Sequence, residues 1–350
     1  MTKKRILFLA AATFLSLSGC GGDSRYSAEF SGLFDTEFAV VGYAGSKTEF
    51  NRLAEHLETR LAELHRMFDI YHGYDGLNNL HTVNENAGAA PVAVPSEVLG
   101  LLTFAKEGFQ LSGGTVDVTL GPVLQIWREY RAGGTSLPSA DELRAASGLR
   151  GIENLVIDPG VGTVFLERAG MSLDVGAIGK GYAAALAVKE AVEAGFTGFL
   201  LNAGGSVTTA GAPPGERGGW RIGVQDPGPY EDGRQATLDV VTGSDFTVSC
   251  SGDYRRTYTV DGVRYHHIID PETLMPAAGF TQVTVLHPDA GIADLLSTAF
   301  FILPYEEGLS LAKGQGAEAM WLRPDGIMSA TDGYKALSEL YGADSEGANG

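Results

Sequence analysis

The sequence predicts an α+β protein in which mixed or antiparallel sheets pack against helices. Two long segments, Lys47–Phe68 and Pro95–Ser112, have the apolar periodicity of amphipathic helices. Short strand-like segments follow one another through tight turns, as in the hairpin expected around Pro159-Gly160. A second hairpin is expected across Asp261-Gly262, because Asp-Gly favours two-residue turns. Together these features predict helices and sheets within a single bilobal unit.

The expected elements begin with Phe34–Tyr43, which alternates enough to be a first strand. Lys47–Phe68 places its leucines and phenylalanines on one helical face, and the polar segment Asp69–Gly88 after it is expected to be a loop. Pro95–Ser112 begins at a proline and is closed by Gly113-Gly114. The other expected helices are Ala140–Ser147, Ala183–Ala194 and Ala290–Leu303, and the other expected strands are Asn154–Asp158, Thr163–Glu167, Met171–Val175, Phe199–Ala203, Trp220–Gln225, Ala236–Val241, Phe246–Ser251, Tyr254–Val260, Val263–Ile269, Thr281–Leu286 and Ala317–Leu322.

The chain begins with an apparent export signal. Three basic residues precede the apolar run Ile6–Leu17, which is shorter than the roughly 20 residues that span a bilayer. Leu17-Ser18-Gly19-Cys20 matches the lipobox of bacterial lipoproteins, whose cysteine is lipidated, and an ordinary secretory signal is the alternative. We expect a signal peptide over residues 1–19, a lipidated Cys20 with a flexible tether over 20–33, the functional unit over 34–341, and a disordered tail over 342–350. The protein is then a lipid-anchored lipoprotein of the cell membrane that faces the extracytoplasmic side.

The formal net charge of the chain is −18, and removal of the basic leader makes it more negative still. Such acidity argues against nucleic acid as a partner and against electrostatic docking on anionic lipid. An anionic ligand must therefore be bound by a local site, which a metal ion would help to form. Once Cys20 is lipidated, Cys250 is the one cysteine left, so no intramolecular disulfide is expected.

The stretch Ser172–Tyr182, SLDVGAIGKGY, is the strongest candidate for a binding site. It is expected to run from a short strand through a glycine-spaced turn into a helix, which suits close approach of backbone to a ligand. Lys180 adds a cation where the free N–H groups of a helix N-terminus already favour anions. The spacing matches neither GxGxxG nor the Walker pattern. We therefore expect a phosphate-bearing ligand, with a purely structural turn as the alternative.

Asp294 and Thr298 are four residues apart and so lie on the same face of the expected helix. A carboxylate beside a hydroxyl is a plausible pair of oxygen ligands for Mg²⁺, which commonly bridges protein and phosphate. The alternative is an aspartate that interacts favourably with the helix dipole and a threonine bonded to its own turn.

Other reactive residue types form no familiar catalytic set. His266 and His267 are adjacent, so on a strand they point to opposite faces and cannot share one metal. No HExxH pattern or cysteine partner suggests zinc. Cys250 is expected to be a structural thiol, because no Ser-His-Asp arrangement or nucleophile elbow accompanies it.

Several stretches resemble, in order and spacing, the ApbE family of FAD:protein FMN transferases. They are SLDVGAIGKGY, LLNAGG, WRIGVQDP, SGDYRRTYTVDGVRYHHIIDP and ADLLST, with TVDVTLGPVLQIW and FDT resembling the earlier motifs. The resemblance runs from about Phe34 to Leu322. Many members of the family are exported lipoproteins, in agreement with the lipobox.

The resemblance implies a reaction and a set of site residues. Members transfer the FMN half of FAD through a phosphoester to a threonine or serine of a target protein and release AMP. Carried over by position, the Mg²⁺ ligands are Ala177 through its carbonyl, Asp294 and Thr298. The implied FAD-binding positions are Phe34, Tyr71, Thr115, Val116, Asp117, Asp174, Lys180, His267 and Ile268.

The implied catalytic residues are Asp174, Lys180 and His267. Mg²⁺ and Lys180 would neutralise the pyrophosphate and stabilise the leaving AMP, and either His267 or Asp174 would serve as a base. Phe34 stands where the family commonly has methionine, and Cys250 where threonine is frequent. Two other activities fit the same site: an Mg²⁺-dependent FAD pyrophosphatase that gives FMN and AMP, and a non-catalytic FAD-binding lipoprotein.

Overall fold

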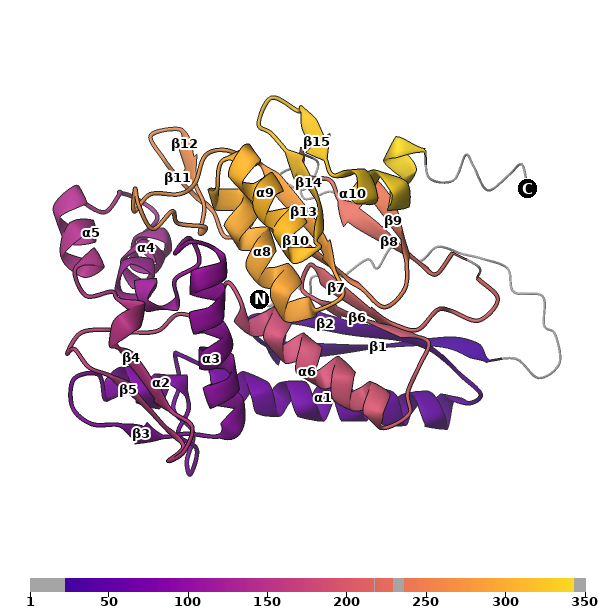
Figure 1. The fold of residues 1–350 in the computed structure, drawn as a ribbon, viewed down its shortest axis with the longest axis horizontal. Helices are drawn as coiled ribbons and strands as arrows, with labels where there is room; N and C mark the ends of the chain where they lie inside the picture. Colours follow the sequence, from indigo (N-terminus) through magenta and orange to yellow (C-terminus); the bar gives the residue numbers. More distant parts are fainter. Residues whose placement is uncertain (1–22, 217, 229–235, 343–350) are drawn as a thin grey trace, which may run out of the picture.

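The fold is organised by one large antiparallel sheet, seen in a computed structural model that describes residues 23–216, 218–228 and 236–342 (Figure 1). Its eight strands run in the order β1-β2-β6-β7-β10-β13-β14-β15. Every neighbouring pair is antiparallel, so the α+β class is confirmed in its antiparallel form. The strands are β1 Ser24–Leu33, β2 Thr36–Ala44, β6 Phe199–Ala203, β7 Ser206–Ala210, β10 Thr247–Gly252, β13 Gln282–His287, β14 Glu318–Leu322 and β15 Met328–Ala330.

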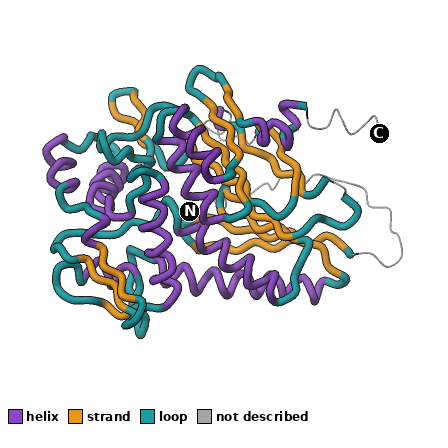
Figure 2. Tube along the Cα trace, in the orientation of Figure 1, coloured by secondary structure: helices purple, strands orange, loops and turns teal. Residues whose placement is uncertain are grey.

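Four helices cover one face of this sheet: α1 (Lys47–Phe68), α6 (Gly179–Glu193), α8 (Ala290–Ile302) and α9 (Tyr305–Gln315) (Figures 1 and 2). Ser46 caps α1 by accepting a hydrogen bond from the Glu49 N–H at 3.2 Å. The apolar stripe of α1 is buried as its periodicity predicts. α8 is apolar almost all round and lies directly over β10 and β13. This packing fixes the N-terminus of α6 against α8, where the candidate site lies.

The opposite face of the sheet is covered by a hairpin, β8 (Trp220–Gln225) and β9 (Thr237–Gly243), together with α10 (Asp332–Leu337) and the short 3₁₀ helix η3 (Glu339–Tyr341). Buried Asp239 on β9 accepts hydrogen bonds from Tyr334 Oη at 3.0 Å, Ser338 Oγ at 2.6 Å and the Leu340 N–H at 3.0 Å. A buried carboxylate with this many donors is fully satisfied. It ties the C-terminal segment to the sheet.

A second lobe lies beside the helical face, on the left in Figure 1. It contains α2 (Leu80–Glu85), α3 (Ser96–Leu111), α4 (Gly121–Gly133), α5 (Ala140–Ser147), the 3₁₀ helices η1 (Val118–Leu120) and η2 (Ile152–Asn154), and a small sheet of β3 (Val92–Ala93), β5 (Thr163–Leu166) and β4 (Leu155–Asp158). One hydrophobic core contains residues of both lobes, such as Leu101 of α3 and Leu295 of α8. A smaller core joins Trp127 of α4 to the hairpin β11 (Tyr258–Val260) and β12 (Val263–Tyr265).

Most of the helices and hairpins expected from the sequence are present, but the expected tether is wrong in part. Ser24–Leu33 forms the edge strand β1, which pairs with β2 and packs Tyr26 on Phe50 at 5.5 Å between ring centroids. The apolar residues of this strand lie on one half-buried face, and the rest of it is rich in serine. Its composition therefore resembles that of a flexible linker. The signal peptide, Cys20 and the tail from residue 343 lie outside the described residues.

Two other expectations are also corrected. Met171–Val175 is not a strand, because the side chain of Asn84 takes the place of a strand partner: its Oδ1 accepts from the Leu173 N–H at 2.7 Å and its amide donates to the Leu173 carbonyl at 3.0 Å. The expected loop Asp69–Gly88 contains α2, which begins at an Asn79 capping box. The strands β7 and β15 and the helix α9 (Tyr305–Gln315) were not predicted. None of the described helices is both long and apolar enough to cross a membrane.

Candidate functional site

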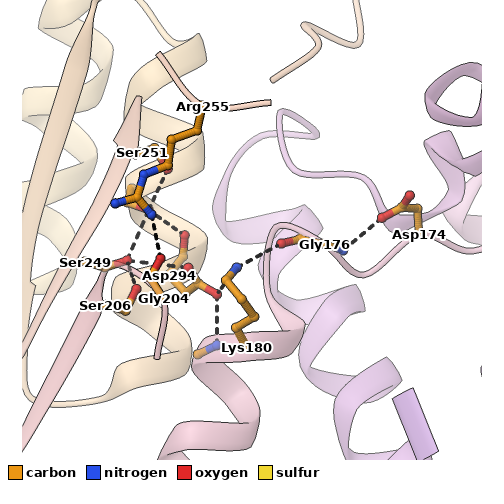
Figure 3. Close-up of polar contacts among 11 residues, drawn as sticks. Asp174, Gly176, Lys180, Gly204, Ser206, Ser249, Ser251, Arg255 and Asp294 are labelled. Carbon is orange, nitrogen blue, oxygen red and sulfur yellow. Dashed lines mark hydrogen bonds and ion pairs between the residues drawn. The ribbon is translucent and has the colours of Figure 1, made fainter. Parts of the chain in front are cut away.

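The candidate site is built around the glycine-spaced turn that leads into α6. Its entrance is fixed by the Asp174 N–H, which donates to the Val118 carbonyl at 2.8 Å. Asp174 Oδ1 accepts from the Gly176 N–H at 2.9 Å, which closes the first bend of the turn (Figure 3). Asp174 Oδ2 accepts from Arg128 Nη2 of α4 at 2.6 Å. Both oxygens of this expected FAD contact are therefore already engaged by the protein.

α6 and α8 can touch at Gly181 because glycine has no side chain, and there is no room for one at this position. A Cβ at Gly181 would lie 2.3 Å from Asp294 Cβ and 2.4 Å from the Ala290 carbonyl oxygen. The Gly181 N–H donates to Asp294 Oδ2 at 2.8 Å (Figure 3). Lys180 Nζ lies 3.6 Å from the same oxygen and 3.4 Å from the Gly176 carbonyl. The turn and α8 thus meet through one buried carboxylate.

The residues around Asp294 fit a hard divalent cation. The described residues hold no group of three or more His, Cys, Asp or Glu side chains that could bind a metal ion. Asp294 and Thr298 offer oxygens from the same face of α8. Gly181 lies in the first turn of α6, where backbone N–H groups have no acceptor within the helix, and its N–H donates to Asp294. Carboxylate, hydroxyl and carbonyl oxygens, as Asp294, Thr298 and Ala177 would offer, are donor types that Mg²⁺ prefers.

A chain of buried hydroxyls supports Asp294 from the sheet side (Figure 3). Ser249 Oγ lies 3.4 Å from Asp294 Oδ1 and 2.8 Å from Ser206 Oγ on the neighbouring strand. Ser297 Oγ donates to the Asp294 carbonyl at 2.9 Å, so the 2.9 Å contact between Ser251 and Ser297 has Ser251 as its donor. Of these contacts, the one from Ser249 reaches the carboxylate itself and helps to orient it, whereas the one from Ser297 reaches the Asp294 backbone.

The two adjacent histidines follow β12, because the expected strand Val263–Ile269 ends at Tyr265, and they have different environments. His266 Nδ1 accepts from the Ile268 N–H at 3.2 Å, so its Nε2 carries the proton and donates to the Ala277 carbonyl at 2.7 Å. That ring is a buried structural element. His267 Nδ1 is buried and has no hydrogen-bond partner among the described residues. Burial, and then the positive charge of Arg256, lower the pKa of His267 to about 3, with His266, Arg131 and Lys180 acting in the same direction.

Tyr71 forms an exposed aromatic wall near the turn. Its ring is 45% exposed, and the Arg128 guanidinium lies over it with its central carbon 4.6 Å from the ring centroid. The loop behind it is fixed by buried Asp69, which accepts from the Tyr71 N–H at 2.7 Å and from Tyr74 Oη at 2.8 Å. These hydrogen bonds hold the pKa of Asp69 below its usual value against the effect of burial. Arg128 therefore links Tyr71 to Asp174.

Comparison with known proteins settles the family. Residues 34–321 match the ApbE family. The chain belongs to the ApbE family. An FAD:protein FMN transferase of Treponema pallidum is 34% identical over 268 residues, which is 73% of each chain. One from Vibrio cholerae is 27% identical over 342 residues, 93% of this chain and 95% of the relative.

Solved structures agree with this assignment. The crystal structure of the ApbE protein from Thermotoga maritima superposes with a TM-score of 0.80 at 28% identity, covering 90% of this chain and 99% of that one. The flavin transferase ApbE from Vibrio cholerae has a TM-score of 0.76 at 23% identity, which supports the fold, with coverage of 90% and 99%.

The other positions implied by the ApbE resemblance lie on the segments that border the turn. Val116 is buried, and its N–H donates to Ser112 Oγ at 3.0 Å; Thr115 precedes it in the same bend. Asp117 caps η1 by accepting from the Thr119 N–H at 2.8 Å, and burial raises its pKa. η1 in turn supplies the Val118 carbonyl to the turn. Ile268 is buried in the main core beside His267.

Phe34 lies in the two-residue turn between β1 and β2 with φ at +49°, followed by Asp35 at +52°. A non-glycine pair with positive φ is the arrangement of a type I′ hairpin turn, which phenylalanine rarely adopts. The Phe34 N–H donates to His65 Nδ1 at 3.2 Å, and the ring packs edge-on to His65. His65 therefore holds this strained turn in place.

Sequence reasoning missed two arginines of the site region. Arg255 Nη1 donates to the Gly204 carbonyl at 2.7 Å and Nη2 to Gln225 Oε1 at 2.8 Å, which braces the glycine pair after β6. Arg128 was missed because its partners Tyr71 and Asp174 are remote in sequence. The sequence feature that could have indicated Arg128 is the run of polar residues that follows buried Trp127 on α4. Cys250, which we expect to be a structural thiol, contacts Thr284 Oγ1 at 3.5 Å, and burial raises the pKa of its thiol.

Proposed function

We propose that this protein transfers the FMN half of FAD to a threonine or serine hydroxyl of an exported acceptor protein, releases AMP, and requires Mg²⁺. The observation that carries the proposal is the meeting of Lys180, the α6 N-terminus and buried Asp294 at one point. A lysine, free helix N–H groups and a cation bound at a carboxylate are all complementary to a pyrophosphate. The activity in the names of the relatives, FAD:protein FMN transferase, is the reaction that such a site favours.

The chemistry is a displacement at phosphorus. The acceptor oxygen forms a bond to the phosphorus of the FMN half, the bond from that phosphorus to the bridging oxygen breaks, and AMP leaves with the electron pair. Bound Mg²⁺, held by Asp294, Thr298 and the Ala177 carbonyl, would supply charge neutralisation to the pyrophosphate. Lys180, whose Nζ lies 3.6 Å from Asp294 Oδ2, would add a second positive charge beside the pyrophosphate. Catalysis of this kind depends on positioning and electrostatics.

The proton of the acceptor hydroxyl is best accepted by His267. Its Nδ1 has no partner among the described residues, so that nitrogen has no competing hydrogen bond. The lowered pKa keeps the imidazole neutral but also makes it a weak base, which is enough only because phosphoryl transfer depends mostly on positioning and electrostatics. Asp174 suits this role less well, since Arg128 and the Gly176 N–H already engage its two oxygens. We therefore assign Asp174 to holding the turn and His267 to the proton.

One assay tests the proposed function against its two rivals. The purified protein is incubated with FAD, Mg²⁺ and a threonine-containing acceptor peptide, and the products are separated by mass. Covalent FMN on the peptide with stoichiometric AMP supports transfer. Free FMN with AMP and no labelled peptide indicates a pyrophosphatase, and unchanged FAD indicates a binding protein. Either of the last two results overturns the proposal.

We further propose that Cys20 is lipidated and holds the protein at the extracytoplasmic face of the cell membrane. The lipobox at Leu17–Cys20 and the basic, apolar leader support this location. An exported transferase would meet its acceptor proteins outside the cytoplasm, where FAD must also be available.

A further inference from the structure

Arg128 makes two close contacts that join opposite sides of the site. Its Nη2 lies 2.6 Å from Asp174 Oδ2, and its guanidinium carbon lies 4.6 Å from the centroid of the Tyr71 ring. The Asp174 side chain is only 11% exposed and that of Arg128 33% exposed, so the ion pair is shielded from water on one side. A shielded, short, charge-assisted contact of this kind fixes the arginine in one orientation.

Tyr71 is well placed to receive a flat ligand. The planar guanidinium packs against its ring, yet 45% of the residue stays exposed. The backbone below it is fixed by the Tyr71 and His72 N–H groups, which donate to Asp69 Oδ1 at 2.7 and 3.2 Å. An exposed aromatic ring on a loop this well held loses little entropy when a second ring stacks on it.

We propose that Arg128 is a positioning residue for FAD: by pairing with Asp174 and packing on Tyr71, it holds the Tyr71 ring as a stacking platform for a flat ring of the dinucleotide. The inference rests on the proposed function, because it assumes that FAD enters beside the turn. It adds that α4, through a residue outside the motifs of the family resemblance, sets the affinity for FAD. Arg128 does not act on the transferred phosphorus, since both its contacts are to protein groups.

The test separates the two contacts of Arg128. Arg128→Met removes both the charge and the planar group, whereas Arg128→Lys keeps a cation for Asp174 but loses the plane over Tyr71. Tyr71→Leu removes the ring itself, and the double variant Arg128→Met/Tyr71→Leu completes a cycle. Arg144→Met is the matched control, because Arg144 lies on neighbouring α5 and makes only an exposed ion pair with Asp141. Thermal unfolding checks that each variant is folded.

The first readout is FAD affinity in the absence of acceptor, measured by equilibrium dialysis, and the second is the split between KM for FAD and kcat. Stacking of a base on an aromatic side chain is worth about 1–3 kcal/mol, so Tyr71→Leu should weaken FAD binding roughly ten-fold or more. Arg128→Met should weaken it by a similar factor and the double variant by little more, with kcat at saturating FAD changed less than about two-fold. Arg128→Lys should fall between wild type and Arg128→Met, and Arg144→Met should equal wild type.

FMN and ADP, tested separately as ligands, identify the ring. Weaker binding of FMN to Arg128→Met places the isoalloxazine on Tyr71, and weaker binding of ADP places the adenine there; both support the proposal. Unchanged FAD affinity in Arg128→Met overturns it, as does a double variant whose loss equals the product of the two single losses. A wild-type protein that binds FAD but transfers no FMN contradicts the proposed function alone. A wild-type protein that does not bind FAD contradicts both.

Discussion

Asp294 is the residue on which the electrostatics of the site converge. Its side chain is buried, yet its closest cation, Lys180 Nζ, stays 3.6 Å away and also contacts the Gly176 carbonyl. A buried carboxylate is costly unless a charge or several hydrogen bonds compensate it. The Gly181 N–H and the Ser249 hydroxyl supply part of that compensation. A bound Mg²⁺ would supply the rest.

Asp294→Asn is expected to weaken Mg²⁺ much more than it weakens the fold. Asparagine keeps the shape and one ligand oxygen, so the free energy of unfolding should change by only about 1–2 kcal/mol. FMN transfer should fall steeply and require more Mg²⁺ for half-maximal rate. The measurement is FMN transfer to a peptide across a Mg²⁺ titration, with direct Mg²⁺ binding by calorimetry.

Thr298→Val serves as the graded comparison, because it removes a neutral ligand from the same face of α8. Its loss should be smaller than that of Asp294→Asn, and added Mg²⁺ should restore it more readily. A folded Asp294→Asn protein with the wild-type rate and the wild-type Mg²⁺ midpoint would show that Asp294 is no metal ligand.

His267 should make the protein less stable in mild acid. Burial, and secondarily Arg256, lower its pKa in the folded protein to about 3, below the ordinary value near 6.5. Between these values the unfolded chain binds a proton that the folded one does not, so the stability present above pH 6.5 is lost as the pH falls toward 3. Replacing His267 with glutamine should flatten the decrease in Tm between pH 7 and pH 5.

The same lowered pKa predicts that kcat/KM of the wild-type protein has no inflection near pH 6.5 from this residue, since the free enzyme keeps the imidazole neutral. A Tm that falls equally in wild type and His267→Gln would contradict the burial of a neutral imidazole at this position.

At the scale of elements, the site depends on how closely α6 approaches α8. Gly181 permits this contact, and its N–H reaches Asp294 because no side chain intervenes. Lys180 lies in the first turn of α6, and Ala177 lies in the bend just before that helix. A change in the distance between the two helices would therefore move the proposed metal ligands relative to one another.

Gly181→Ala should destabilise the protein although alanine is the better helix former. The added methyl would meet Asp294 Cβ at 2.3 Å and the Ala290 carbonyl oxygen at 2.4 Å, and such overpacking costs about 1–3 kcal/mol. Tm should fall by several degrees, and the Mg²⁺ midpoint should rise because the helices separate.

Gly314→Ala is the matched control in exposed α9, where an added Cβ meets no atom within 4 Å. There the higher helix propensity should act alone and raise stability by up to about 1 kcal/mol. Equal Tm values for Gly181→Ala and wild type would contradict the close contact of α6 and α8.

The elements that the sequence predicted well are those whose apolar pattern decides their structure. α1 and α5 have the predicted bounds, and the β4–β5 hairpin lies where the Pro159-Gly160 turn indicates. β7 was missed because the core it enters is partly polar: Ser206 and Thr208 bond the hydroxyls of Ser249 and Thr247 across the sheet. The hydroxyls of such a pair form their hydrogen bond only when the strands come together in the folded sheet. The local sequence therefore does not indicate that these residues are buried.

At the scale of the whole molecule, the order of the motifs predicted the family, while geometry between distant segments was not predictable. The motif around Lys180 and the Asp294–Thr298 spacing are local features. The pairing of Arg128 with Asp174 and Tyr71 depends instead on how α4 packs beside the turn, which no local pattern records. Asn84 likewise replaces a strand partner from far away in the sequence.

The position of β1 changes what the lipid anchor implies for the molecule. Because β1 begins at Ser24, only residues 21–23 separate it from Cys20, a span of at most about 14 Å even when fully extended. A lipidated Cys20 would therefore hold the edge of the large sheet close to the membrane surface, not on a long tether. Acceptor proteins at the same surface would be favoured by their effective concentration.

Cys20→Ala should accordingly separate location from catalysis. The variant should lack lipid and leave the membrane fraction, because the lipobox has lost its acceptor thiol, whereas the folded residues from Ser24 onward are unchanged. FMN transfer to a soluble peptide should equal wild type, and flavinylation of membrane-bound acceptors in cells should fall.

Cell fractionation and the mass of the mature N-terminus measure the loss of the lipid anchor, and flavin fluorescence of separated membrane proteins measures the fall in flavinylation. Cys250→Ser, which changes the other cysteine, should stay in the membrane fraction. Wild-type protein recovered entirely soluble, with an unmodified Cys20, would show that the anchor is absent.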